Sequence, residues 1–296
     1  MTAPRIVQAN GVDLCVQSFG DKLDPALLLI AGAAGSMDWW EDELCERLAA
    51  GGCFVMRYDH RDTGQSASYP PRAPGYDGRD LVEDAVGVLD ALAVRCAHVV
   101  GMSMGGGVAQ ELALLHPGRV APLTLISTSP AVPREADKPA LPPPSDELRK
   151  RFADPLPEPD WSDRAAVADY LIEDWRPYFG SRGFDESALR ELAARVVERT
   201  RNIASSMTNH SVMEQGEPVR ARLGEIRSPT LVVHGTDDPL FPYAHGEALA
   251  AEIPGARLLG LTGVGHEYPP RATWAEVVPA ILRLTTARRA RPLREP

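Results

Sequence analysis

Residues 99–107 read VVGMSMGGG, and this stretch decides how the surrounding chain is expected to fold. The residues AHVVG form an apolar run typical of a buried strand, and MGGGVAQELALLH has a helical pattern. A strand that turns into a helix within about three residues leaves Ser103 at the apex of a strained turn. Gly101 and Gly105 are expected beside it because a Cβ atom there would collide with the adjoining strand or helix. The Ser103 hydroxyl would then project from the sheet at the helix N-terminus.

The rest of the chain repeats this alternation of short apolar runs and helical patterns. Strand-like runs occur at 13–19, 26–30, 53–58, 97–101, 121–128, 230–235 and 256–261. Helical patterns occur at 39–52, 78–94, 104–116, 245–253 and 274–287. Short strands separated by helices predict an α/β fold, a mostly parallel, twisted sheet with helices on both faces. Strands of such a sheet are buried on both sides, which explains continuous apolar runs such as LLLI.

The segment 129–225 interrupts this alternation. It opens with a proline-rich stretch, in which missing backbone donors block regular structure. Two helical patterns follow, DRAAVADYLIEDW and ESALRELAARVVERTRNIA. We therefore expect a core domain formed by residues 1–128 and 226–296. Residues 129–225 would form a helical cap (lid) inserted between two strands of that core.

The serine at the turn could act as a nucleophile if other loops supply the groups it needs. A serine hydroxyl is a poor nucleophile until a base takes its proton. Of the seven histidines, His266 stands in the glycine-rich loop GVGH, which would place it beside Ser103 at one edge of the sheet. The base needs a carboxylate that fixes its tautomer, and the loop HGTDDP offers Asp237 and Asp238.

An attacked carbonyl also needs backbone N–H donors for the negative charge that develops on its oxygen. One donor is expected from Met104, the residue after the nucleophile. The second is expected from the loop AGAAGS, whose small residues let the backbone approach a ligand closely. We assign this second donor to Ala33, with Gly32 as the neighbour that permits the turn.

Segments along most of the chain resemble the α/β hydrolases: LLLIAGAAG, RYDHRDTGQS, HVVGMSMGG, PTLVVHGTDDPLFP and GVGH. Within that family they are most similar to aclacinomycin methylesterase-type esterases. The resemblance implies an α/β-hydrolase fold and a catalytic triad of Ser103, Asp238 and His266, which occur in the family's order. It also implies that the chain is a carboxylic ester hydrolase. Many relatives carry His-Gly before the oxyanion residue, whereas this chain has Ala31 and Gly32.

We therefore expect a serine hydrolase that cleaves a carboxylic ester through an acyl-enzyme intermediate. A methyl ester of a bulky hydrophobic or polyketide-like compound is the candidate substrate. Lactonases, carbon–carbon bond hydrolases and cofactor-free perhydrolases or haloperoxidases share the serine triad and remain alternatives. A non-catalytic small-molecule binding protein is a further alternative, because function follows from the site and not from the fold.

Substrate contacts are expected from large apolar side chains near the serine and in the insertion. Met102 and Met104 flank the nucleophile and would form an adaptable apolar pocket. The other candidates are Gly32, Trp39, Trp175, Tyr178 and Phe179. Aromatic residues at helical spacing are more often internal to a cap than in contact with a ligand.

Charge and composition limit the expected partners. The 296 residues carry 31 basic and 41 acidic side chains, a net charge of −10. The clustered arginines of 287–295 are interpreted as a solvated end, so nucleic acid is not an expected partner. We expect a small-molecule ester as the partner of a monomer or homodimer.

Cysteine usage and the apolar stretches bear on cofactors and location. The four cysteines form no CxxC pair and no histidine lies at metal spacing from them, so no metal or other cofactor is expected. The N-terminus has no signal-peptide pattern, and the longest apolar stretch, 26–34, is too short to span a bilayer. We expect a cytoplasmic protein with no membrane partner.

Overall fold

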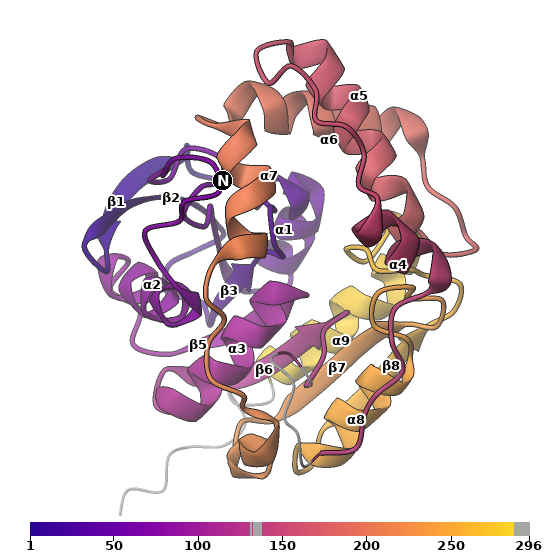
Figure 1. The fold of residues 1–296 in the computed structure, drawn as a ribbon. Helices are drawn as coiled ribbons and strands as arrows, with labels where there is room; N and C mark the ends of the chain where they lie inside the picture. Colours follow the sequence, from indigo (N-terminus) through magenta and orange to yellow (C-terminus); the bar gives the residue numbers. More distant parts are fainter. Residues whose placement is uncertain (131, 133–137, 287–296) are drawn as a thin grey trace, which may run out of the picture.

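The computed structural model describes residues 1–130, 132 and 138–286, and these form one sheet with helices around it (Figure 1). The strands are β1 (Arg5–Ala9), β2 (Val12–Phe19), β3 (Ala26–Ile30), β4 (Phe54–Tyr58), β5 (Ala97–Met102), β6 (Val120–Ile126), β7 (Thr230–Gly235) and β8 (Arg257–Leu261). The α-helices are α1 (Asp42–Ala50), α2 (Gly78–Ala91), α3 (Met104–Leu115), α4 (Asp146–Ala153), α5 (Arg164–Trp175), α6 (Glu186–Arg199), α7 (Ile203–Val212), α8 (Ala244–Glu252) and α9 (Trp274–Thr286). Short 3₁₀ turns are η1 (Met37–Trp39), η2 (Arg176–Tyr178), η3 (Arg220–Glu225) and η4 (Arg271–Thr273).

The strand order in the sheet is β1-β2-β4-β3-β5-β6-β7-β8. β2 runs antiparallel to β1 and β4, and the other adjacent pairs are parallel. The predicted mostly parallel sheet is therefore confirmed. The edge strand β1 was not expected, because most of its residues are exposed and it has no continuous apolar run.

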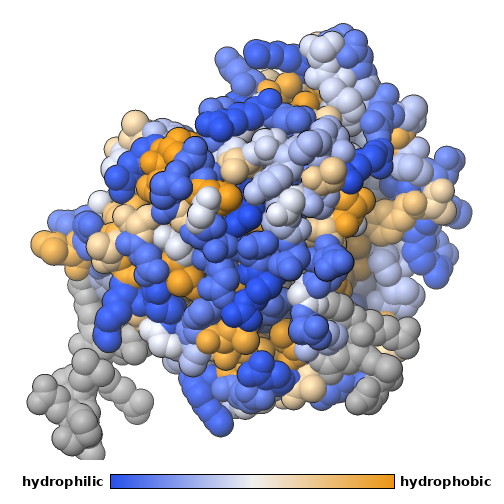
Figure 2. Space-filling view, turned by 60° about the vertical axis from the view of Figure 1, so that its left-hand side comes forward, coloured by the Kyte–Doolittle hydropathy of each residue, from blue (hydrophilic) through white to orange (hydrophobic). Residues whose placement is uncertain are grey.

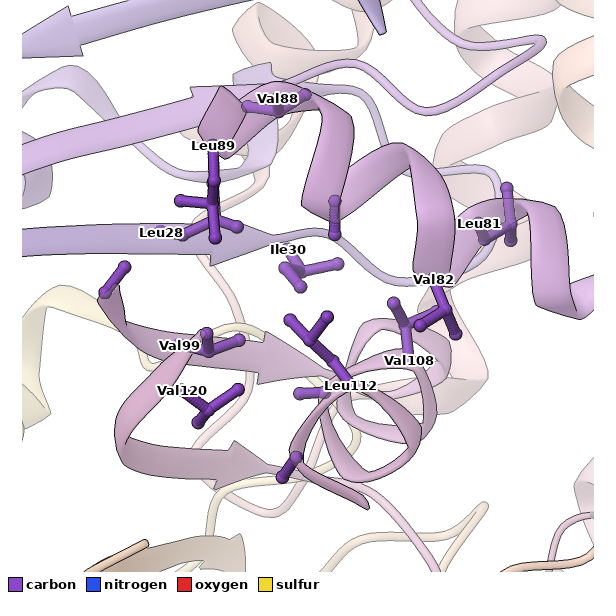
Figure 3. Packing of buried hydrophobic residues seen from close by; sticks show 14 of the residues in the cluster. Leu28, Ile30, Leu81, Val82, Val88, Leu89, Val99, Val108, Leu112 and Val120 are labelled. Carbon is purple, nitrogen blue, oxygen red and sulfur yellow. The ribbon is translucent and has the colours of Figure 1, made fainter. Parts of the chain in front are cut away.

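Helices cover both faces of the sheet, as predicted. Leu28 and Ile30 of β3 point to the face covered by α2, α3 and α8, while Leu27 and Leu29 point to the face covered by α1 and α9. Figure 3 shows the first of these faces, where Leu112 of α3 lies close to the strands. Each fully buried leucine stabilises the fold by about 1.5–3 kcal/mol relative to an exposed one. The double-sided core fixes the strand ends that carry the site.

The chain between β6 and β7 supplies α4 to α7, and α5 packs against α6 through an apolar cluster of its own that includes Leu171 and Val196. In Figure 1 these two helices lie together at one end of the molecule. The expectation of one helix over 186–204 is wrong, because α6 ends at Arg199 and α7 begins at Ile203. Asn202 has extended backbone and its side chain accepts a hydrogen bond from the Ser205 N–H, so it starts a new helix.

The surface is mixed in character. On the face that Figure 2 shows, hydrophobic residues form small groups among hydrophilic ones. In the described part of the chain, no helix combines the length and the apolar character that a membrane crossing requires. The arginine-rich segment 287–295 lies outside the described residues.

Candidate active site

Ser103 lies between β5 and α3 with a φ of 52°, a conformation that L-residues rarely adopt. The adjoining glycines make this turn sterically feasible. A Cβ atom on Gly101 would lie 2.1 Å from the Gly105 carbonyl oxygen, and one on Gly105 would lie 2.4 Å from the carbonyl oxygen of Ala31. Strain of this kind costs about 1–3 kcal/mol and persists where the surroundings enforce it.

Contacts with β6 and the residues after it hold the strained turn in place. The Ser103 N–H donates to the Ile126 carbonyl at 3.0 Å, and the Thr128 hydroxyl donates to the Ser103 carbonyl at 2.8 Å. A Cβ atom on Gly106 would lie 2.6 Å from the Thr128 side chain. The turn is thus fixed from the strand on one side and from the helix on the other.

The structure brings Ser103, His266 and Asp238 together at the carboxyl ends of β5, β8 and β7. The Nε2 atom of His266 lies 2.9 Å from the Ser103 hydroxyl oxygen, and its Nδ1 atom lies 2.9 Å from Oδ2 of Asp238. Both distances are those of hydrogen bonds. Because Oδ2 accepts a hydrogen bond from the Nδ1–H group, Nε2 is left free to take the proton of the hydroxyl.

The Asp238 carboxylate is buried and well satisfied. Its Oδ1 atom accepts hydrogen bonds from the N–H groups of Leu240 at 2.9 Å and Phe241 at 2.8 Å. Burial acts to raise the pKa of Asp238, but the nearby His266 and these donors outweigh it, and the net shift is downward. Asp238 is therefore an anion that can stabilise a protonated His266.

The neighbouring acid Asp237 faces elsewhere. Its carboxylate accepts from the Ser181 N–H at 3.2 Å and from the Thr236 hydroxyl at 3.0 Å. On the other side of Asp238, the Nε2 atom of His234 lies 3.5 Å from Oδ2. Burial lowers the pKa of His234, which keeps this ring neutral beside the carboxylate.

A segment from the insertion supports the loop that carries His266. The His266 N–H donates to the Tyr178 carbonyl at 2.7 Å, and the Arg182 N–H donates to the Gly263 carbonyl at 3.0 Å. A Cβ atom on Gly265 would lie 2.2 Å from the same Tyr178 oxygen. The glycines of GVGH thus permit close backbone contact with the insertion, in addition to shaping the loop.

Ala33 and Met104 are the residues expected to form an oxyanion hole. Both line a cavity together with Ser103. Within the described residues, neither backbone N–H donates to another protein group. Two unpaired N–H groups beside the nucleophile are what a developing oxyanion requires.

The loop before Met37 is stiffened by side chains distant in sequence. The Gly32 N–H donates to the Tyr268 hydroxyl at 2.9 Å, and the Ala34 N–H donates to Nδ1 of His210 at 2.9 Å. These contacts fix the loop on both sides of Ala33, although Ala31 stands where many relatives have a histidine.

Two buried histidines complete this support. Nε2 of His60 donates to the Ala31 carbonyl at 3.0 Å, and Nε2 of His210 donates to the Arg61 carbonyl at 3.0 Å. Burial lowers the pKa of His60 to about 4 and that of His210 to about 3. Both rings are neutral near pH 7, so they position the loop without adding charge to it.

The cavity at the serine has a volume of about 170 Å³. Its walls come from α2, α3, α7 and the residues that follow it, and from the segments after β3, β6 and β7. They include Leu81, Val108, Glu111, His210, Met213 and Phe241. The cavity is therefore largely apolar, with one carboxylate in its wall.

Most of the residues expected to contact substrate lie outside this cavity wall in the described part of the chain; Met104 is in it. Gly32 and Met102 are buried beneath the serine. Trp39 packs edge-to-face on Trp175, with ring centroids 4.2 Å apart, and stacks on Tyr268 at 5.3 Å. These rings join the insertion to the oxyanion loop.

The other two aromatic candidates lie at η2. The Tyr178 ring is 6.0 Å from the His266 ring, and its carbonyl supports the histidine loop as described above. Phe179 stacks on Phe184 with centroids 4.4 Å apart and belongs to the apolar cluster of the insertion. The Phe179 ring thus packs inside the insertion, and the Tyr178 ring lies against the core.

Sequence reasoning missed Tyr268, His210 and Glu111. The first two reach the oxyanion loop across 236 and 176 residues, and no motif surrounds either of them. A hydroxyl or imidazole without a local motif has no distinguishing signal in a single sequence. Glu111 belongs to the helical pattern after Ser103, where one acidic residue on a helix is unremarkable.

Fold and site together define a hydrolase architecture with a serine at a strand–helix turn. Residues 25–268 match the family described as alpha/beta hydrolase fold, and the chain belongs to this family.

Two similar proteins are methylesterases by name. Rhodomycin D methylesterase DauP of Streptomyces sp. (strain C5) is 35% identical over 280 residues, which cover 90% of this chain and 92% of that protein. Rhodomycin D methylesterase DnrP of Streptomyces peucetius is 34% identical, with the same coverage. The expected similarity to methylesterases is thereby confirmed.

Among solved structures, a hydrolase from Pseudomonas aeruginosa PA01 is similar over nearly its whole length. It has a TM-score of 0.69 and 29% identity, and the match covers 98% of this chain and 99% of that one. The likeness extends through the insertion as well as the sheet.

Proposed function

We propose that this protein is a serine hydrolase that cleaves a carboxylic ester through an acyl-enzyme intermediate. The observation that carries the proposal is the pair of 2.9 Å contacts of His266, one to Ser103 and one to Asp238. An imidazole placed between a hydroxyl and a buried carboxylate can take the hydroxyl proton and remain stabilised while it carries that proton. The names of the two methylesterase relatives support an ester as the substrate.

In the first half of the reaction, the Ser103 oxygen attacks the ester carbonyl carbon while His266 accepts its proton. The carbonyl oxygen becomes an oxyanion that the N–H groups of Ala33 and Met104 stabilise. The carbon–oxygen bond to the alcohol then breaks, and the alcohol leaves with the proton from His266. An acyl ester on Ser103 remains.

In the second half, a water molecule attacks the acyl carbon while His266 accepts one of its protons. The bond between the acyl carbon and the Ser103 oxygen breaks, the proton returns to Ser103, and the free acid leaves. The sequence consumes one ester and one water and releases one acid and one alcohol. The proposed steps need no metal or other cofactor.

A methyl ester of a bulky hydrophobic acid is the substrate class that we propose. The rhodomycin D methylesterase relatives and the apolar cavity wall, with Leu81, Val108 and Met213, support this assignment. We further propose that residues 129–225 act as a cap over the core formed by 1–128 and 226–296. Contacts from this segment to the loops of Ala33 and His266 support that role.

The test is a hydrolysis screen with purified wild-type protein and the Ser103→Ala variant. The panel contains methyl esters of polycyclic and simple acids, lactones, a vinylogous 1,5-diketone for carbon–carbon cleavage, and a peracid assay. We expect methyl esters to be hydrolysed fastest and Ser103→Ala to lower kcat/KM by about 10³-fold or more. Ester hydrolysis that persists in Ser103→Ala, or turnover of the diketone or a lactone above all esters, would contradict the proposal.

A further inference from the structure

The cavity follows one face of α3 away from the nucleophile. Met104, Gly107, Val108 and Glu111 all line it. Their spacing of three, four and seven residues places them along one side of a helix. With a rise of about 1.5 Å per residue, the backbone of Glu111 lies about 10 Å along the helix from that of Met104.

Gly107 leaves the floor of this cavity open. A Cβ atom built on it would have nothing within 4 Å, in contrast to Gly105 two residues earlier, where a Cβ atom would collide with backbone. Glycine inside a helix is less favourable than alanine, and packing does not require it here. Because Gly107 has no side chain, it leaves the cavity open between Ser103 and Glu111.

The Glu111 carboxylate stands at the far end of that space without a partner. Within the described residues it has no hydrogen bond and no ion pair. Gly216 lies against it, and a Cβ atom there would be 2.6 Å from the carboxylate oxygen. Leu81 and Met213 are apolar neighbours in the same wall. A half-buried carboxylate among apolar groups is unfavourable unless something compensates its charge.

The surrounding charges point to a cation as the compensating group. Burial raises the pKa of Glu111 to about 7, and Asp77 and Glu217 act in the same direction. Arg79 acts in the opposite direction, but its guanidinium is paired with Glu83 at 2.7 Å. An acidic group with further acids nearby attracts a positive ligand.

We propose that Glu111 is a specificity-determining residue that binds a protonated amine on the acid portion of the substrate, about two helical turns along α3 from the ester carbonyl. This inference rests on the proposed ester hydrolysis at Ser103. The apolar body of the substrate would pass over Gly107, and its amine would donate hydrogen bonds to Glu111.

The test compares three methyl esters that share one aromatic body and differ only at the end distant from the ester. That end carries a primary aminomethyl, a hydroxymethyl or an ethyl group. We expect wild-type kcat/KM to be about tenfold higher for the amine than for the ethyl compound, and Glu111→Gln to abolish this ratio. Glu217→Gln removes a nearby acid outside the cavity wall and should preserve the ratio.

The pH dependence of the same ratio gives a second readout. A primary amine stays protonated up to about pH 10, whereas Glu111 ionises near pH 7, so the preference for the amine should rise between pH 6 and 8. Any pH effect on the ester-cleavage step itself applies to both compounds and cancels in the ratio. The Glu111→Gln ratio should stay flat over this range.

Hydrolysis of p-nitrophenyl acetate, which is too short to reach Glu111, separates the two proposals. If wild type cleaves it and Ser103→Ala does not, the proposed reaction holds whatever the three esters show. With that reaction established, equal rates for the amine and ethyl compounds would overturn the role of Glu111. A preference for the hydroxymethyl compound over the amine would also overturn it, as would an amine preference that survives Glu111→Gln.

Discussion

At the strand ends, Ser103 and His266 are held by backbone contacts so close that a Cβ atom would not fit, whereas α6 of the insertion is attached to the core through side chains. Gly101 and Gly105 show the first kind of contact. Arg199 of α6 shows the second, with its guanidinium 2.6 Å from both Asp59 and Asp38 of the core. The comparison teaches that main-chain geometry positions the proposed reacting groups, while α6 is attached by side-chain contacts that substitution can alter one at a time.

The largest effect is expected at the strand ends, from Asp238→Asn. An amide at this position favours the wrong tautomer of His266 and removes the anion that stabilises its protonated form, so kcat should fall by about 10⁴-fold. Steady-state kinetics on a methyl ester measures this. The matched control is Asp237→Asn, whose side chain faces Ser181 and should change kcat/KM by about twofold or less. Equal losses in the two variants would contradict the assignment of Asp238.

The next effect concerns the attachment of the insertion, tested by Arg199→Met. This change leaves Asp59, whose side chain is fully buried, without its cationic partner and should lower the free energy of unfolding by about 3–5 kcal/mol. Urea denaturation followed by circular dichroism measures it. Arg190→Met, on the same helix, removes only a solvent-exposed ion pair with Asp169 and should leave the free energy of unfolding almost unchanged. A mild effect at Arg199 would show that the ion pair does not hold α6 to the core.

Two glycines of α3 allow a comparison of stability effects within the core itself. Gly105→Ala forces a Cβ atom against the Ala31 carbonyl and should destabilise the protein by about 1–3 kcal/mol or more. Gly107→Ala meets open space and should stabilise it by up to about 1 kcal/mol through helix propensity. Thermal denaturation of both variants checks the opposite signs. The same sign for both would refute the division of these glycines into a packing role and a cavity role.

An effect no larger than that of Gly105→Ala is expected where the two regions meet, from Tyr268→Phe. The variant keeps the ring between Trp39 and Trp40 but removes the acceptor of the Gly32 N–H, at a cost of about 1–3 kcal/mol. Part of that cost should appear as a reduced kcat, because the oxyanion loop loses a support. Paired stability and kinetic measurements test this, with Tyr243→Phe as the control. An unchanged kcat would mean that the hydroxyl supports only the fold.

The core and its three reacting residues could be predicted because their signals are local. Buried parallel strands read as apolar runs, and their carboxyl ends share one edge of the sheet, so Ser103, His266 and an acid of the loop HGTDDP could be expected to meet. The choice of Asp238 over Asp237 came from the family resemblance. The helix break at Asn202 was missed because neither glycine nor proline marks it. The exposed strand β1 was missed because only a buried face produces a hydrophobic pattern.

The residues of the cavity wall could not be predicted from local sequence patterns, for a different reason. Leu81, Glu111 and Met213 come from three segments that meet only when the whole chain has folded. The aromatic residues Trp39 and Trp175 carried the stronger sequence signal for binding, yet they pack on each other. Size and hydrophobicity indicate that a residue is buried, and they do not indicate whether it faces a cavity or another side chain.

The central claim is that Ser103 is an activated nucleophile, and labelling with a fluorophosphonate followed by mass spectrometry tests it most directly. The account predicts a single covalent adduct per chain on the peptide that contains Ser103, and no adduct in folded Ser103→Ala protein. A wild-type protein that stays unlabelled while folded, or an adduct that persists in Ser103→Ala, would contradict it.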